Sequence, residues 1–139
     1  MKIHRLLWVA LAGGALAFSA GAGAADNKSH PVRCQGTYSS FEFNKEGGDL
    51  LGLEIKIVPA GEHFEAVVQS AQGEPGALFL ATATCSKGRI TISIPKQPDR
   101  PFVSLEGVVS KNGIKAQLNY EGGSVEKIFV PRRPGYWDR

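Results

Sequence analysis

Short apolar runs that alternate with polar residues constrain the fold of this chain more than any other feature of its sequence. The clearest run, at 51–57, reads Leu-Gly-Leu-Glu-Ile-Lys-Ile. A period of two residues is that of a β-strand with one buried face. Similar runs recur between turns rich in Gly, Pro, Asn and Asp, and no amphipathic helical pattern occurs among them. The sequence therefore predicts an all-β domain.

The turns divide this region into about eight short strands. The predicted strands are 32–43, 51–57, 64–70, 77–85, 90–94, 102–110, 114–120 and 124–130. A change of phase at Ser39-Ser40 in the first of them predicts a bulge or a sharp bend. Because short loops make consecutive strands pair antiparallel, we expect a single small antiparallel meander barrel. A two-sheet β-sandwich is the alternative that the pattern leaves open.

Residues 1–25 have the character of a cleavable signal peptide. Lys2 and Arg5 precede an apolar segment, and small residues follow it up to Ala24 and Ala25. This order predicts export and cleavage near these two alanines. The apolar segment is interrupted by two glycines and is short for a membrane-spanning helix. We therefore expect a periplasmic or extracellular protein with no transmembrane segment in the mature chain.

The rest of the chain is expected to form one domain with two short flanking segments. A flexible leader at 26–31 precedes the barrel domain at 32–130, and a basic and aromatic tail follows at 131–139. The formal net charge of +3 includes Lys2 and Arg5, so most of the basic character would leave with the signal peptide. The remaining charge does not favour a nucleic-acid partner.

Cys34 and Cys85 are the only cysteines of the chain. An even number of cysteines in an exported protein favours a disulfide, and we expect one between these two. Closing a loop of this length stabilises a domain by about 4 kcal/mol in the chain-entropy model. No Cys-x-x-Cys pair or histidine cluster accompanies them, so the sequence predicts neither a metal site nor a cofactor.

No group of residues in the sequence forms a recognisable catalytic motif. His63 lies in a predicted turn close to Glu65 and is interpreted as an exposed turn histidine. No Gly-x-Ser-x-Gly motif occurs. Other carboxylates are scattered over turns and positions expected to face outward: Glu54, Glu74, Glu106 and Glu126. We therefore predict no catalytic residues and expect that the protein is not an enzyme.

The tail gathers side chains that often anchor protein interfaces, namely Arg132, Arg133, Tyr136 and Trp137. Arginine and tryptophan bury large areas and make directional contacts, so these residues are candidates for binding a partner. The alternative is that Tyr136 and Trp137 fold back and plug one end of the barrel.

The connection at 95–101 is a second candidate surface for a partner. Three prolines stiffen it, and it carries Lys96, Asp99 and Arg100. A loop that is already stiff loses less conformational entropy on binding, which is why inhibitors use such loops.

The first predicted strand opens with Gly36-Thr37-Tyr38, and arginines lie near the other end of the chain. This arrangement resembles the calycin group of small barrels, the lipocalins and avidins, in which a Gly-x-Trp of the first strand lies against an arginine at the closed end. The resemblance implies that Gly36 and Tyr38 take this role, with tyrosine in place of tryptophan and Arg132 or Arg133 as the partner. It also implies a barrel that binds an apolar ligand.

The sequence thus favours a non-enzymatic exported binding module for a small apolar ligand, and Tyr38 is among its candidate binding residues. Aliphatic side chains at the inward positions would suit such a ligand, but they could equally fill an eight-stranded interior. The alternative is a protein–protein role, either as an inhibitor of an extracytoplasmic hydrolase or as a subunit of an envelope assembly.

Overall fold

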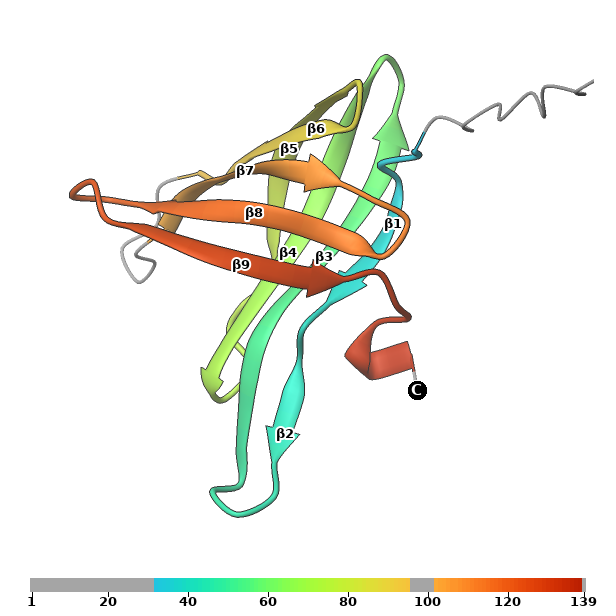
Figure 1. Ribbon diagram of the computed structural model, residues 1–139. Helices are drawn as coiled ribbons and strands as arrows, with labels where there is room; N and C mark the ends of the chain where they lie inside the picture. The colour runs from blue at the N-terminus through green and yellow to red at the C-terminus, as the bar shows by residue number, and fades with distance from the viewer. Residues whose placement is uncertain (1–31, 96–101, 139) are drawn as a thin grey trace, which may run out of the picture.

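The computed structural model describes residues 32–95 and 102–138, and the predicted signal peptide, the leader, Lys96, Asp99 and Arg100 lie outside these ranges. The described part consists of β-strands and one short 3-10 helix, η1 (Figure 1). The elements are β1 (Gly36–Ser39), β2 (Glu42–Asn44), β3 (Asp49–Ala60), β4 (His63–Gly73), β5 (Phe79–Ser86), β6 (Arg89–Ser93), β7 (Phe102–Val109), β8 (Gly113–Tyr120), β9 (Val125–Pro131) and η1 (Tyr136–Asp138).

The strands form one antiparallel sheet that curls into a nearly closed barrel. Eight of them follow the order β1-β3-β4-β5-β6-β7-β8-β9, and β2 pairs with β3 beside β1. The two ends of this path meet at an antiparallel bridge between Tyr38 and Arg132. The predicted antiparallel barrel is therefore confirmed, and the alternative of two separate sheets is wrong because the ladder is continuous from β1 to β9 (Figure 1).

The predicted irregularity at Ser39-Ser40 divides the first strand into β1 and β2. The backbone N–H of Ser40 donates a hydrogen bond of 2.8 Å to the carbonyl of Leu53, and the backbone N–H of Leu53 donates one of 2.9 Å to Ser40 Oγ. Gly52 permits this close approach, because a Cβ atom there would lie 2.5 Å from the carbonyl oxygen of Ser40. At the bend, the hydroxyl of Ser40 thus accepts the hydrogen bond of Leu53 N–H that a backbone carbonyl would accept in a regular sheet.

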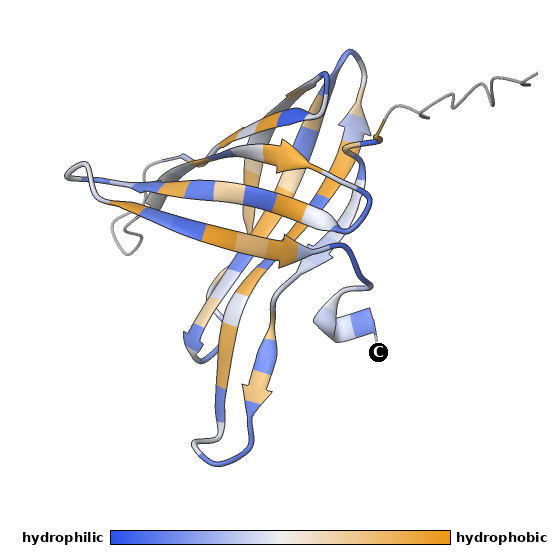
Figure 2. Cartoon of the chain, viewed as in Figure 1, coloured by the Kyte–Doolittle hydropathy of each residue, from blue (hydrophilic) through white to orange (hydrophobic). Residues whose placement is uncertain are grey.

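Alternating hydropathy along the strands separates an inner from an outer face (Figure 2). The inward side chains of Tyr38, Ile55, Ile92, Ile114 and Val130 are each fully buried. Branched and aromatic side chains of this size fill the interior of an eight-stranded barrel. One part of the interior is therefore a packed core.

The predicted disulfide between Cys34 and Cys85 is present. It joins the segment before β1 to β5, so it ties the first described residues to the barrel wall. Residues 32–95 and 102–138 contain no helix that is long and apolar enough to span a membrane. The same ranges contain no group of three or more His, Cys, Asp or Glu residues that could hold a metal ion.

Unequal strand lengths leave the other part of the barrel open. β3 and β4 pair with each other from Ala60 and His63 to Leu50 and Gly73, whereas β5 pairs with β4 only as far as Val68. The far halves of β3 and β4, with β2 beside them, therefore project beyond the remaining strands (Figure 1). This projection forms one wall of the candidate site.

Candidate functional site

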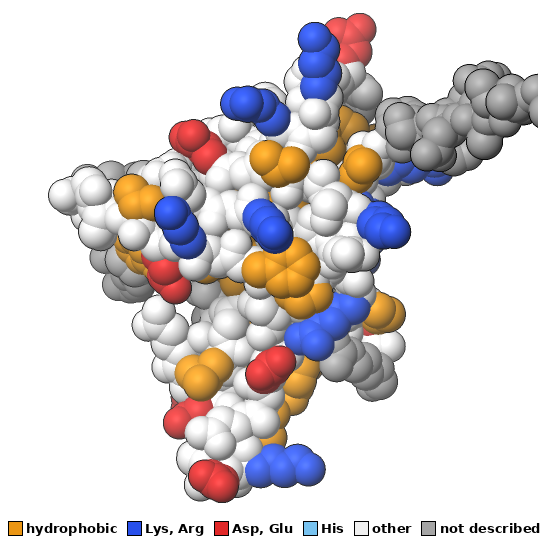
Figure 3. Space-filling view, viewed as in Figure 1, with side chains coloured by type: hydrophobic (Ala, Val, Ile, Leu, Met, Phe, Trp, Pro, Cys, Tyr) orange, Lys and Arg blue, Asp and Glu red, His pale blue; other side chains and the backbone are white. Residues whose placement is uncertain are grey.

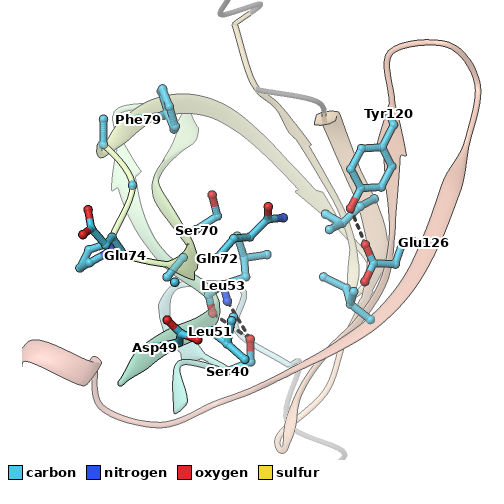
Figure 4. Close-up of a pocket in the computed structure, with 18 of the residues that line it drawn as sticks. Ser40, Asp49, Leu51, Leu53, Ser70, Gln72, Glu74, Phe79, Tyr120 and Glu126 are labelled. Atoms are coloured by element: carbon cyan, nitrogen blue, oxygen red, sulfur yellow. Dashed lines mark hydrogen bonds between the residues drawn. The ribbon is translucent and has the colours of Figure 1, made fainter. Parts of the chain in front are cut away.

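A cavity of about 1010 Å³ lies between the projecting part of β3 and β4 and the strands β8 and β9 (Figure 4). Leu53, Phe79 and Leu118 line it, and each is less than 8 % exposed. These three residues belong to the same apolar core that fills the rest of the barrel. The cavity is thus an opening into the barrel interior with an apolar floor.

Polar side chains stand nearer the solvent on both walls of the cavity. Ser70 and Gln72 of β4 lie on one wall, and Tyr120 and Glu126 lie on the opposite wall, at the ends of β8 and β9 (Figure 4). The cavity therefore changes from apolar at its floor to polar at its mouth.

Tyr120 and Glu126 are joined by a short hydrogen bond, in which the tyrosine hydroxyl donates to the carboxylate. This bond, with a smaller contribution from burial, raises the pKa of Tyr120 to about 12. The phenol is therefore neutral at physiological pH, and it orients the Glu126 carboxylate at the mouth of the cavity.

The sequence reasoning missed most of this site, because it treated Glu74 and Glu126 as solvated carboxylates with no role. Both line the cavity. For Glu126 a signal was present: along β9 it shares its parity with Ile128, which lines the cavity, and with Val130, which is fully buried. Strict alternation along β9 would have placed Glu126 on the inner face.

Tyr38, a candidate ligand residue, takes part in closing the barrel. The Arg132 guanidinium lies over its ring, with Cζ 4.6 Å from the ring centroid, and donates a hydrogen bond to its hydroxyl. Tyr38 in turn donates to the carbonyl of Cys34 at 2.8 Å, and Arg132 donates to the carbonyls of Gln35 at 3.0 Å and Arg33 at 2.6 Å. Burial raises the pKa of Tyr38, and the positive charge of Arg132 opposes part of this rise.

Gly36 completes this contact, because a Cβ atom at its position would lie 2.8 Å from Nη1 of Arg132. The structure thus brings together Gly36, Tyr38 and Arg132, three of the residues named by the calycin resemblance. That the protein is related to the calycin group stays a prediction.

Arg133, the second tail arginine, binds the backbone at the bend between β1 and β2. Its Nε donates to the carbonyl of Ser39 at 2.6 Å, and its Nη2 donates to the carbonyl of Phe41 at 3.0 Å. Both tail arginines are therefore occupied by backbone carbonyls of the domain itself.

The aromatic residues of the tail lie on the outer face of β3 and β4. The backbone N–H of Tyr136 donates to Glu54 at 2.6 Å, and the indole N–H of Trp137 donates to Gln69 at 3.0 Å. Glu54 and Gln69 are directly opposite each other in the ladder, next to the inward pair Ile55 and Val68. Since successive side chains of a strand point to opposite faces, this acceptor pair points outward.

A small outer cluster of apolar side chains receives the ring of Tyr136. Phe41, Leu50 and Ala71 form this cluster, and the ring centroid of Tyr136 lies 6.0 Å from that of Phe41 in an edge-to-face arrangement. Trp137 contacts Tyr136 but remains 57 % exposed. The tail therefore covers the outer surface of the barrel and does not enter its end.

No family model matches the chain, and no curated protein or solved structure was found to be similar to it. Functional assignment therefore rests on the geometry of the described residues. His63 and Glu65 do not belong to the candidate site. Their side chains form an exposed pair 3.8 Å apart, and neither lines the cavity.

Proposed function

We propose that the protein is a non-enzymatic binding module and that its ligand occupies the cavity at the open end of the barrel. The observation that carries this proposal is the volume of about 1010 Å³ over a floor of buried Leu53, Phe79 and Leu118. Small-molecule sites commonly measure about 300–1,000 Å³ and are largely apolar with a few polar groups. Transfer of an apolar ligand surface from water to this floor is favourable by roughly 25 cal/mol for each Å² buried.

The chemistry of the mouth supports binding without conversion of the ligand. A general acid or base works best when its pKa lies near the operating pH. Tyr120 is far from that condition, because its hydrogen bond to Glu126 raises its pKa to about 12.

We further propose that the protein acts outside the cytoplasm, in the periplasm or the medium. The disulfide between Cys34 and Cys85 supports this location, because structural disulfides persist in oxidising compartments and are rare in the cytosol.

The proposal can be tested with Nile red, a neutral apolar dye that fluoresces when it leaves water. We expect the protein to bind it, and we expect Ser70→Phe to weaken this binding because the new ring would occupy the cavity. Thr82→Phe is the matched control, since Thr82 is exposed on β5 and does not line the cavity. Circular dichroism establishes that both variants keep the β fold.

Equal binding by the wild type, Ser70→Phe and Thr82→Phe would place the dye elsewhere and overturn the proposal. Mass spectrometry of the protein under native conditions, after purification from its own host, gives an independent readout. A ligand retained by the wild type and lost in Ser70→Phe supports the proposal.

A protein partner is the second candidate function, and the exposure of Trp137 favours it. A tryptophan that is 57 % exposed, held in place by Tyr136 and Gln69, is a suitable anchor for an interface. An extracytoplasmic hydrolase or an envelope subunit would be the partner. A photo-crosslinking amino acid at Trp137 should then give a discrete product in the host envelope, and the same group at Thr82 should not. Identical products at both positions would reject a specific interface.

A further inference from the structure

The mouth of the cavity carries acidic side chains from three separate elements. Asp49 lies at the start of β3, Glu74 lies in the turn after β4, and Glu126 lies on β9. Figure 4 shows them around the opening, with Glu126 across the cavity from the other two. None of the described residues that line this cavity is lysine, arginine or histidine. Among the described lining residues, the negative charge of the opening therefore has no basic side chain to balance it.

Hydrogen-bond acceptors continue from the mouth towards the apolar floor. Ser70 and Gln72 offer side-chain oxygens from the β4 wall, and Glu126 offers its carboxylate from the β9 wall (Figure 4). Tyr120 donates its hydroxyl proton to Glu126 and so orients this carboxylate. Because Ser70 and Gln72 can donate as well as accept, the selective feature of this set is the carboxylate charge, which a cationic head group with N–H donors matches.

The charge on the rest of the surface has a different distribution. Acidic side chains, with one basic side chain at the tip, are visible on the lower part of the molecule, where β2, β3 and β4 project, and several basic side chains lie over β8 and β9 (Figure 3). Lys115 and Lys127 on the latter strands line a separate, shallower groove. An approaching cation would thus be favoured at the open end of the barrel over the outer face of β8 and β9.

We propose that the ligand of the cavity is an amphipathic amine, whose hydrocarbon part contacts Leu53, Phe79 and Leu118 and whose ammonium group lies at the mouth, attracted by the combined charge of Asp49, Glu74 and Glu126. This inference rests on the proposed binding function and specifies its ligand. A fatty acid would add a further negative charge at the same mouth, where like charges repel.

A metal ion does not suit the same carboxylates. Calcium binds six to eight oxygens that converge on one point, and magnesium demands a near-octahedral set. Asp49, Glu74 and Glu126 instead stand around the opening on different walls (Figure 4). An ammonium group needs no such convergent shell, because its attraction to Asp49, Glu74 and Glu126 acts over several ångströms without direct contact.

Three probes of equal chain length test this inference: decylamine, decanol and decanoate. We expect calorimetric titration at neutral pH and low salt to rank decylamine first and decanoate last. The triple variant Asp49→Asn, Glu74→Gln, Glu126→Gln should weaken decylamine binding, by roughly two- to fivefold for each carboxylate removed, and leave decanol binding unchanged. Glu62→Gln is the matched control, since Glu62 lies in the exposed turn between β3 and β4 at the other end of these strands.

The outcomes separate this inference from the proposed function. If decanoate binds as tightly as decylamine, or if the triple variant keeps full affinity for decylamine, the inference of an amine ligand is overturned. The proposal that the cavity is the binding site then still stands. If none of the three probes binds and Ser70→Phe does not alter Nile red binding, both proposals fail. A loss of decylamine affinity in Glu62→Gln equal to that of the triple variant would overturn the specific role of the mouth.

Discussion

Arg132 lies over the ring of Tyr38 and joins the last strand of the barrel to the first. The guanidinium carbon is 4.6 Å from the ring centroid, and the guanidinium also donates to the tyrosine hydroxyl. The hydroxyl is fixed in turn by the carbonyl of Cys34 at 2.8 Å. Together with the backbone bridge between Tyr38 and Arg132, this side chain closes the sheet where β1 and β9 would otherwise present open edges.

We expect Arg132→Ala to be strongly destabilising. The substitution removes the hydrogen bonds to Tyr38 and to the carbonyls of Arg33 and Gln35, and bonds that involve a charged group each contribute about 1.5–3 kcal/mol. Because such losses are not additive, the expected decrease in the free energy of unfolding is about 2–4 kcal/mol. Urea denaturation followed by circular dichroism measures it.

Arg89→Ala is the matched control for this loss, since Arg89 is an exposed arginine on β6. Its replacement should change stability by no more than about 0.5 kcal/mol. Equal effects of the two substitutions would contradict a special role for Arg132 in closing the barrel. Arg132→Lys should fall in between, because lysine keeps the charge but lacks the planar fork.

The disulfide between Cys34 and Cys85 should account for a large part of the stability of the domain. Replacing both cysteines by serine frees a loop with a sequence separation of 51, which costs about 4 kcal/mol in the chain-entropy model. We expect a lower midpoint of thermal unfolding in the double variant, and an equal midpoint in the reduced wild type. If reduction leaves the midpoint unchanged, the disulfide does not constrain the unfolded chain as assumed.

The strands and the bend between β1 and β2 were predictable because their signals are local. Alternation over residues 51–57 marks an inner and an outer face, and the change of phase at Ser39-Ser40 marks the break between the two strands. The disulfide was predictable as well, since Cys34 and Cys85 are the only cysteines.

The cavity and the position of the tail depend on relationships between distant segments, which have no local signal. The cavity exists because β4 continues past Val68, where its pairing with β5 ends. Tyr136 reaches Glu54 across a sequence separation of 82. Leu50-Leu51 gave one indication, since two adjacent apolar residues in a strand are expected where both faces are covered, and Leu50 does pack in the outer cluster with Tyr136.

Gly52 should tolerate no larger residue, because the bend of the first strand lies against it. In Gly52→Ala the new Cβ would meet the carbonyl oxygen of Ser40 at 2.5 Å, and the residue already has a φ of 121°. Gly48→Ala is a suitable control, since Gly48 has a φ of 76° but no atom within 4 Å of its Cβ position. We expect about 1–2 kcal/mol of destabilisation from the left-handed backbone at Gly48 and a larger loss at Gly52. Similar losses in the two variants, measured by urea denaturation, would show that the approach of Ser40 is not limiting.

Alkaline pH should weaken the fold through Tyr120. Its pKa lies at about 12 in the folded protein, against an ordinary value of 10.0, so the folded state holds this proton more tightly than the unfolded chain. The resulting stability is fully present below pH 10.0 and is lost as the pH rises towards 12. We expect the free energy of unfolding to fall with pH across this window, and to fall less steeply in Tyr120→Phe. Urea denaturation at several alkaline pH values measures the slope, and identical slopes in the two proteins would assign the effect to Tyr38, whose pKa is also raised.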